Sequence, residues 1–122
     1  MGRGRGISIF KVNMKNGALR LLDVQPDPQI IGKNPTYVVF HPTVPVFYCT
    51  NEDAENGDIR AIQFDPKTFA CSLINVESAR GGAPCHLTIS SCGKWLFSAT
   101  YVGHSTLMYP IAKNGKLGGC SQ

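Results

Sequence analysis

Short runs of apolar and β-branched residues alternate with polar turns along the whole chain. Three such runs, at residues 6–12, 57–64 and 105–111, each lead through a polar turn into another apolar run. The turns contain Asn16-Gly17, residues 65–68 and Asn114-Gly115. Asn-Gly between such runs is a strong hairpin signal. The pattern therefore predicts a series of antiparallel hairpins.

A second unit alternates with the first. Residues 32–52 match residues 81–101, and each reads as glycine, proline, an apolar strand, a tight turn and an aromatic-rich strand. The two prolines, Pro35 and Pro84, are 49 residues apart, and the first unit recurs after 52 and 47 residues. A repeat of about 50 residues that holds four short strands is typical of a β-propeller blade. Sustained helical periodicity is absent, so no helix is expected.

These units predict an all-β fold, a β-propeller fragment with about one complete four-stranded antiparallel blade and two partial blades. Residues 1–25 would supply the two outer strands of a first blade, 32–78 the complete blade, and 82–122 a truncated third blade. The expected strands of the complete blade are 37–41, 46–50, 59–64 and 71–76. Those of the third blade are 86–90, 95–100 and 107–111, with a fourth cut off near Leu117. Trp95 is expected in the core.

Length and charge narrow the class of protein. The 122 residues suffice for one domain, and the net charge of +4 is unevenly distributed. The chain lacks the dense basic face with interleaved aromatics of a nucleic-acid binder, so Arg3 and Arg5 are interpreted as a basic end. No apolar run approaches the roughly 20 residues that a membrane helix needs. Without a secretory signal either, the chain is expected in the cytoplasm, with no membrane or nucleic-acid partner.

The five cysteines do not form a metal-binding pattern. They are Cys49, Cys71, Cys85, Cys92 and Cys120, and no two are separated by only two residues. Most lie in or beside apolar runs, where a reduced thiol behaves as a small hydrophobe. We expect unpaired core thiols in a reducing compartment, and neither a metal nor a cofactor.

The order of these units resembles the lactonase family of seven-bladed β-propellers, which includes 6-phosphogluconolactonases and carboxymuconate cyclases. The resemblance rests on residues 6–10 (GISIF), 34–37 (NPTY), 51–52 (NE), 81–87 (GGAPCHL) and 115–117 (GKL). It implies hydrolysis of a sugar-acid lactone in the pentose phosphate pathway. The chain matches the N-terminal third of the pattern, so the family's catalytic histidine and arginine positions lie beyond residue 122. The hairpin turns at residues 41–45 and 91–93 lack the family's Pro-Asp-Gly.

Strand pairing predicts which polar side chains share one end of a blade. The start of the innermost strand lies beside the end of the second, so Asn34 and Tyr37 are expected near Asn51 and Glu52. If the resemblance holds, these groups rim the mouth of the central channel, where propellers commonly bind ligands. The alternative for Glu52 is a solvated carboxylate in a loop. The alternative for Tyr37 is packing between blades.

The same pairing in the third blade predicts His86 near Tyr101, with His104 in the following loop. His86 and Tyr101 join Asn34, Asn51 and Glu52 as candidate substrate-binding residues. The alternative for His86 is a structural role, and the alternative for Tyr101 is packing. His104 would then simply be exposed, and His41 is interpreted as a turn residue. No nucleophile arrangement is present, since Ser90 and its neighbour lie in a hairpin turn without a glycine-flanked elbow.

Two functions therefore remain. One is a lactone-hydrolysing enzyme of this family, inactive as this length of chain alone. The alternative is a non-catalytic propeller fragment or interaction module. Open blade edges would in either case favour self-association.

Overall fold

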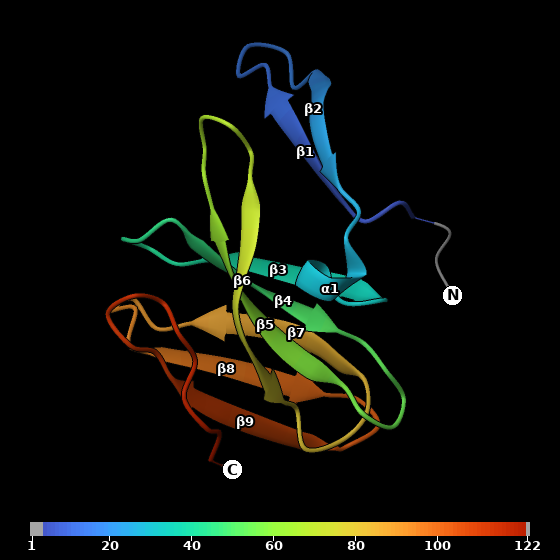
Figure 1. Cartoon of the computed structure of the whole chain (residues 1–122), viewed down its shortest axis with the longest axis vertical. Coiled ribbons are helices and arrows are strands. Elements are labelled where there is room, and N and C mark those ends of the chain that lie inside the picture. The colour runs from blue at the N-terminus through green and yellow to red at the C-terminus, as the bar shows by residue number, and fades with distance from the viewer. Residues whose placement is uncertain (1–3, 122) are drawn as a thin grey trace.

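The computed structural model describes residues 4–121 and is built almost entirely from antiparallel sheets (Figure 1). The first sheet pairs β1 with β2, the second has the order β3-β4-β5-β6, and the third has the order β7-β8-β9. The elements are β1 (Ile7–Val12), β2 (Leu19–Gln25), α1 (Pro28–Ile31), β3 (Pro35–Phe40), β4 (Val46–Asn51), β5 (Asp58–Phe64), β6 (Cys71–Ser78), β7 (Pro84–Ile89), β8 (Trp95–Thr100) and β9 (Ser105–Pro110).

The four-stranded sheet is the complete blade that the sequence predicts. Each strand pairs antiparallel with the next along the chain. Every residue of β4 is buried, because this strand has a neighbour on each side and packing on both faces. The predicted fold class is confirmed: one four-stranded antiparallel blade is flanked by a two-stranded and a three-stranded sheet.

The last residues begin a fourth strand beside β9. Isolated bridges join Met108 to Ser121 and Ile111 to Leu117, both antiparallel. This agrees with the predicted strand near Leu117. The division of the chain at residues 25, 32, 78 and 82 stays a prediction.

One short helix, α1, departs from the expectation of no helix. Asp27 precedes it, and the Asp27 Oδ1 accepts a hydrogen bond from the Gln29 amide at 2.8 Å. Pro28 stands at the first helical position, where the missing N–H is not needed. Four residues are too few to show helical periodicity, so the pattern missed this turn.

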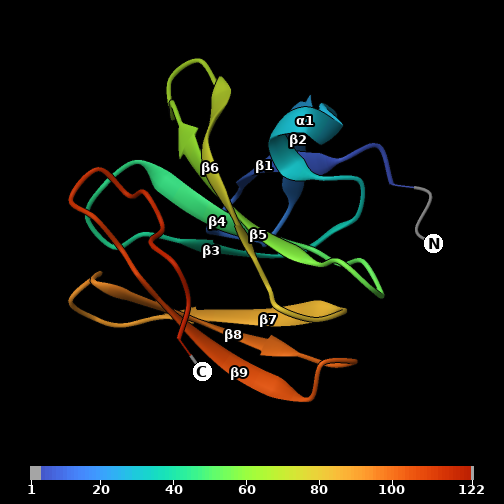
Figure 2. The ribbon, with the colours of Figure 1, turned by 60° about the horizontal axis from the view of Figure 1, so that its bottom comes forward.

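The second and third sheets face each other in two layers, with β7 against β3 and β4 (Figure 2). Nine buried residues join them: Val46, Tyr48, Ile59, Ala61, Leu87, Leu96, Leu107, Tyr109 and Leu117. Tyr48 Oη donates to the Gly115 carbonyl at 2.9 Å and Tyr109 Oη to the Ser78 carbonyl at 3.0 Å. Burial raises the pKa of Tyr48 to about 12, so this hydroxyl remains protonated.

Two expectations about the core are wrong. Trp95 is 39% exposed, because alternate residues of β8 are buried, namely Leu96, Ser98 and Thr100, and Trp95 lies on the opposite face. Of the thiols, Cys49 is buried, whereas Cys85 and Cys92 are exposed and the others half-buried. Alternation would place Cys85 on the same face as the buried Leu87, but the register of β7 shifts between Pro84 and His86, so Cys85 lies at the irregularity and is exposed. All five thiols are free.

Among the described residues, no helix has the length and apolar character needed to cross a membrane.

Candidate functional site

The start of β3 lies beside the end of β4, as the sequence predicts. The Asn34 amide donates to Asn51 Oδ1 at 3.0 Å, and Asn34 Nδ2 donates to the Glu52 carbonyl at 2.9 Å. The Glu52 amide in turn donates to the Asn34 carbonyl at 2.9 Å. These three bonds hold the chain entering β3 against the end of β4. The predicted proximity of Asn34, Asn51 and Glu52 is confirmed.

Asn51 connects this corner to a charged pair that sequence analysis missed. Asn51 Nδ2 donates to Asp58 Oδ2 at 2.8 Å, and Asp58 Oδ1 accepts from Arg60 Nε at 2.8 Å. Arg60 Nη1 also donates to the Gln29 carbonyl of α1 at 2.8 Å. The sequence signal for this pair is an arginine inside an otherwise apolar strand. A half-buried arginine needs a partner for its charge.

His86 meets an aromatic ring of the neighbouring blade. Its ring centroid lies 4.5 Å from that of Tyr37, with the planes tilted by 47°. The partner expected from sequence was Tyr101, but β7 and β8 place Ala99 opposite His86. An irregularity between Pro84 and His86 shifts the register, and the Tyr101 amide instead donates to the Ala83 carbonyl at 2.8 Å.

The remaining candidates lie outside this contact. Tyr101 is 74% exposed at the end of β8. His104 is exposed in the following turn and adopts a left-handed conformation with φ of 49°. His41 does more than shape its own turn: its Nδ1 accepts from the Thr43 amide at 3.1 Å, and its Nε2 lies 2.9 Å from the Gly93 carbonyl of the third sheet.

A polar hollow of about 360 Å³ opens at the start of β3. Its lining includes two predicted residues, Asn34 and Glu52, and the unpredicted Lys33, with Gly4, Gly6, Pro35 and Thr36 completing it. A cation, a carboxylate, an amide and a hydroxyl at one hollow can bind a polar, anionic small molecule through charge-assisted hydrogen bonds. Lys33 is not recognisable from the sequence, because a lone lysine before a strand forms no pattern.

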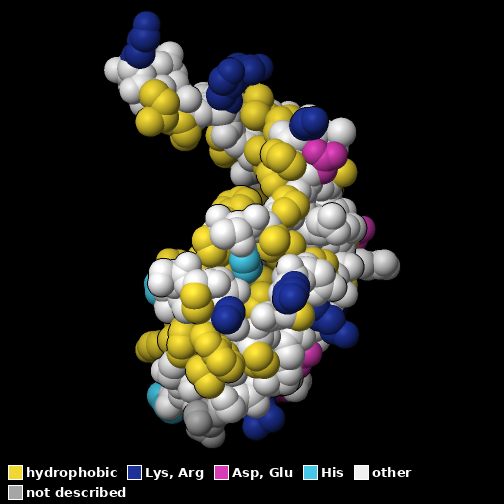
Figure 3. All heavy atoms as spheres, turned by 90° about the vertical axis from the view of Figure 1, so that its left-hand side faces the viewer, with side chains coloured by type: hydrophobic (Ala, Val, Ile, Leu, Met, Phe, Trp, Pro, Cys, Tyr) yellow, Lys and Arg dark blue, Asp and Glu magenta, His cyan; other side chains and the backbone are white. Residues whose placement is uncertain are grey.

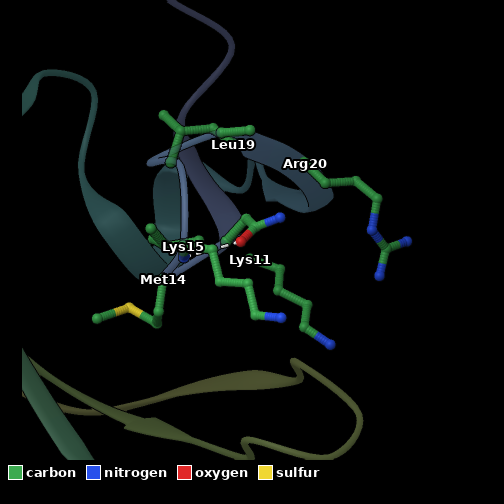
Figure 4. A pocket seen from close by; sticks show the side chains of 8 residues that line it. Lys11, Met14, Lys15, Leu19 and Arg20 are labelled. Atoms are coloured by element: carbon green, nitrogen blue, oxygen red, sulfur yellow. Dashed lines mark hydrogen bonds between the residues drawn. The ribbon is translucent and has the colours of Figure 1, made fainter.

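Two further hollows are poorer in suitable chemistry. One of about 440 Å³ lies between the first and second sheets and is mainly apolar, with Phe10, Phe40, Phe47 and Phe64 in its lining. The other, of about 670 Å³, lies at the tip of the β1–β2 hairpin and carries Lys11, Lys15 and Arg20 (Figure 4). It is larger than the polar hollow, but it lacks a carboxylate or histidine that could act as a base.

Across residues 4–121, histidine, cysteine, aspartate and glutamate side chains form no group of three able to hold a metal ion.

Comparison with known proteins identifies the same family as the order of strands and turns. The family model described as "Lactonase, 7-bladed beta-propeller" matches residues 1–122. A 6-phosphogluconolactonase of Bacillus subtilis is 24% identical over 118 residues, which are 95% of this chain and 32% of that protein. One of Formosa agariphila is 28% identical over 93% of this chain and 32% of its own length.

Solved structures give the same result. A Bacteroides fragilis protein assigned as a 6-phosphogluconolactonase superposes with a TM-score of 0.84 at 28% identity, over 99% of this chain and 32% of its own. A periplasmic gluconolactonase of Pseudomonas aeruginosa shares the fold with a TM-score of 0.76 at 20% identity, over 99% of this chain and 35% of its own. The chain thus spans about a third of the length of these relatives. By its repeated blades and the family match over its whole length, the chain belongs to the lactonase family of seven-bladed β-propellers.

Proposed function

We propose that this chain contributes blades to a propeller that hydrolyses a sugar-acid lactone, with 6-phosphogluconolactone as the substrate. The family match over residues 1–122 carries the proposal. Two relatives named 6-phosphogluconolactonases supply the substrate class. The proposed setting is the cytoplasm, supported by five thiols that remain free.

The proposed substrate-facing groups lie at the starts of β3 and β7. Glu52 and Lys33 line the polar hollow, and His86 is exposed where β7 begins. Lactone hydrolysis needs a base that activates water and a positive or hydrogen-bonding group beside the developing oxyanion. His86 and Glu52 have the chemistry of a base, and Lys33 can contact an anionic substrate group.

The other predicted residues take different parts in the proposal. Both amide atoms of Asn51 are engaged by protein groups, so Asn51 positions the rim rather than binding substrate. Asn34 does the same through its Nδ2. Tyr101 is free to contact a ligand by virtue of its exposure.

The chain alone is expected to show no lactonase turnover. A site at a channel mouth draws its groups from several blades, and loss of one preorganised oxyanion donor typically costs a factor of about 10²–10³ in rate. The assay follows hydrolysis of 6-phosphogluconolactone against its spontaneous opening. An excess rate that disappears in His86→Ala would refute the expected inactivity and assign His86 to the reaction.

Binding tests the substrate class separately from turnover. The product, 6-phosphogluconate, should shift amide resonances at Lys33, Glu52 and His86 in a nuclear magnetic resonance titration. Lys33→Ala should weaken these shifts, whereas Lys113→Ala, at an exposed lysine in the turn after β9, should not. Shifts that stay unchanged in Lys33→Ala, or no shifts at all, would contradict the proposed substrate contact.

A non-catalytic role has one observation in its favour. The mainly apolar hollow between the first and second sheets, together with Phe40 at 60% exposure, offers a surface for another polypeptide. Absence of 6-phosphogluconate binding would favour this second function, an interaction module.

A further inference from the structure

The tip of the β1–β2 hairpin carries positive charge without a carboxylate partner. Lys11, Lys15 and Arg20 are exposed around the hollow at this tip (Figure 4). The chain has no acidic residue before Asp23. Within residues 4–121 the structure forms one ion pair, between Arg60 and Asp58. The three tip cations therefore remain available to a negatively charged partner.

Hydrogen bonds within the turn fix how these cations are presented. Asn13 Oδ1 accepts from the Lys15 amide at 2.9 Å, and Asn16 Oδ1 accepts from the Ala18 amide at 3.1 Å. The Asn13 amide also donates to the Ala18 carbonyl at 2.8 Å. Figure 3 shows dark-blue basic side chains on the projecting upper part of the molecule, clear of the body. The hairpin thus presents its charge on an ordered support.

The fold does not require this charge. The β5–β6 hairpin occupies the corresponding position in the next repeat, and its turn contains both Asp65 and Lys67. Of these two hairpins, only the first has an excess of basic over acidic residues. An interaction that uses it would be additional to blade packing.

Opposite charge gathers on the loop between β4 and β5. Glu52, Asp53 and Glu55 lie there, and Asp53 and Glu55 are exposed. Asp53 Oδ1 accepts from the backbone amides of Asn56 at 2.8 Å and Glu55 at 2.9 Å, and these bonds lower the pKa of Asp53. The carboxylate is therefore ionised at neutral pH. Lys33 is the nearby cation that also lowers this pKa and offsets part of the loop's charge.

The basic tip and the acidic loop lie at different ends of the molecule (Figure 1). The residues that line the hollow at the tip all belong to the hairpin, so the loop of the same copy does not reach it. We propose that the basic tip of one copy contacts the acidic loop, residues 52–57, of a second copy. Because the two surfaces differ, the contact is head-to-tail and can continue to a third copy.

Ionic strength separates this contact from apolar aggregation. Charges on exposed side chains interact over about 30 Å at 0.01 M salt and about 3 Å at 1 M. Sedimentation velocity of the whole chain should therefore show association at low salt that weakens by about tenfold or more at high salt. Burial of apolar surface would not be weakened by salt in this way.

Charge reversal identifies the two surfaces. A tip variant, Lys11→Glu with Lys15→Glu and Arg20→Glu, and a loop variant, Asp53→Lys with Glu55→Lys, should each lose the salt-dependent association at low salt. Their equimolar mixture should associate again, because each reversed surface then meets a complementary one. A control with Lys67→Glu, Lys113→Glu and Lys116→Glu changes the net charge as much as the tip variant but leaves both surfaces intact, and should associate like the parent chain.

Circular dichroism confirms that each variant keeps the parent's β-sheet content before the comparison is made. The proposal is overturned if the parent chain is monomeric at low salt, or if either variant alone associates as the parent does. It is also overturned if the mixture does not regain the salt-dependent association, or if the control loses it as the tip variant does.

Discussion

Asn51 decides at the residue scale how the rim of the polar hollow is held. It is 9% exposed, its Oδ1 accepts from the Asn34 amide, and its Nδ2 donates to Asp58. A buried polar group that loses its partner costs about 1–3 kcal/mol. Removal of the side chain leaves the Asn34 amide without its acceptor, whereas Asp58 Oδ2 keeps Arg60 Nη2 as a donor at 3.4 Å.

Asn51→Ala should lower the free energy of unfolding by about 1–3 kcal/mol. Urea denaturation measures the change, and Asn56→Ala, at an exposed position of the neighbouring loop, is the matched control. Equal stability of the two variants would show that the hydrogen bonds of Asn51 contribute nothing to the fold.

The thiols should differ strongly in reactivity, since the thiolate is the nucleophile. A hydrogen bond with Ser90 is the largest cause that lowers the pKa of Cys92, followed by the backbone amide of Lys94. Burial raises the pKa of Cys49 to about 12. Iodoacetamide at about pH 8 should label Cys92 first and Cys49 only after unfolding, with mass spectrometry identifying the labelled peptides.

The sign of the pH dependence follows from the lowered pKa. The labelling rate of Cys92 should reach half its maximum at a lower pH than that of an ordinary thiol, and Ser90→Ala should move this midpoint to higher pH. A midpoint that does not move would exclude Ser90 as the stabilising group. Cys85, which is also exposed, is the internal comparison.

At the scale of elements, a single arginine fastens α1 to the second sheet. Arg60 of β5 donates to the carbonyls of Pro28, Gln29 and Ile30 and pairs with Asp58. A four-residue helix has too few internal hydrogen bonds to be stable by itself. Its position above the sheet therefore depends on Arg60 and on the burial of Ile31.

Arg60→Met should loosen α1 while leaving the sheets in place. Amide exchange at Ile31 and Gly32, whose amides bond to Asp27 and Pro28, should become faster. Exchange in β8 should not change, because this strand belongs to another sheet. Arg20→Met, on the exposed hairpin, is the matched control, and equal exchange in both variants would contradict the role of Arg60.

At the scale of the whole molecule, packing is incomplete between the first and second sheets. Phe10 is 47% exposed and Phe40 60% exposed beside the apolar hollow. An exposed apolar face of this kind favours association or aggregation. The apolar contribution adds to the charged contact and differs from it in its response to salt.

The chain should bind a hydrophobic dye such as anilinonaphthalene sulfonate and should show poor solubility or self-association in light scattering. Phe10→Glu with Phe40→Glu should reduce both signals, because charged side chains then cover the hollow. Lys67→Gln with Lys113→Gln, at two exposed positions away from the hollow, changes the net charge by the same amount and is the control. A compact monomer without dye binding, unfolding cooperatively, would contradict the expected exposure of apolar surface.

The sequence by itself determined the repeat, the strands and the family. Alternation of apolar and polar residues is local, and turn residues such as Asn16-Gly17 fix where a strand ends, so both can be read without coordinates. The same local rule placed Asn34 beside Asn51, since a hairpin pairs its two ends. It did not identify the neighbours of His86, because β8 pairs this residue with Ala99 and its ring contacts Tyr37 of another blade.

Only the tertiary structure decided what joins elements far apart in sequence. The contact of His86 with Tyr37, the bonds from Arg60 to α1 and the polar hollow that includes Lys33 all depend on how sheets pack. Exposure of Trp95 and Cys92 was decided in the same way. The physical reason is that burial is set by the neighbouring layer, whose distance and angle no local pattern of residues encodes.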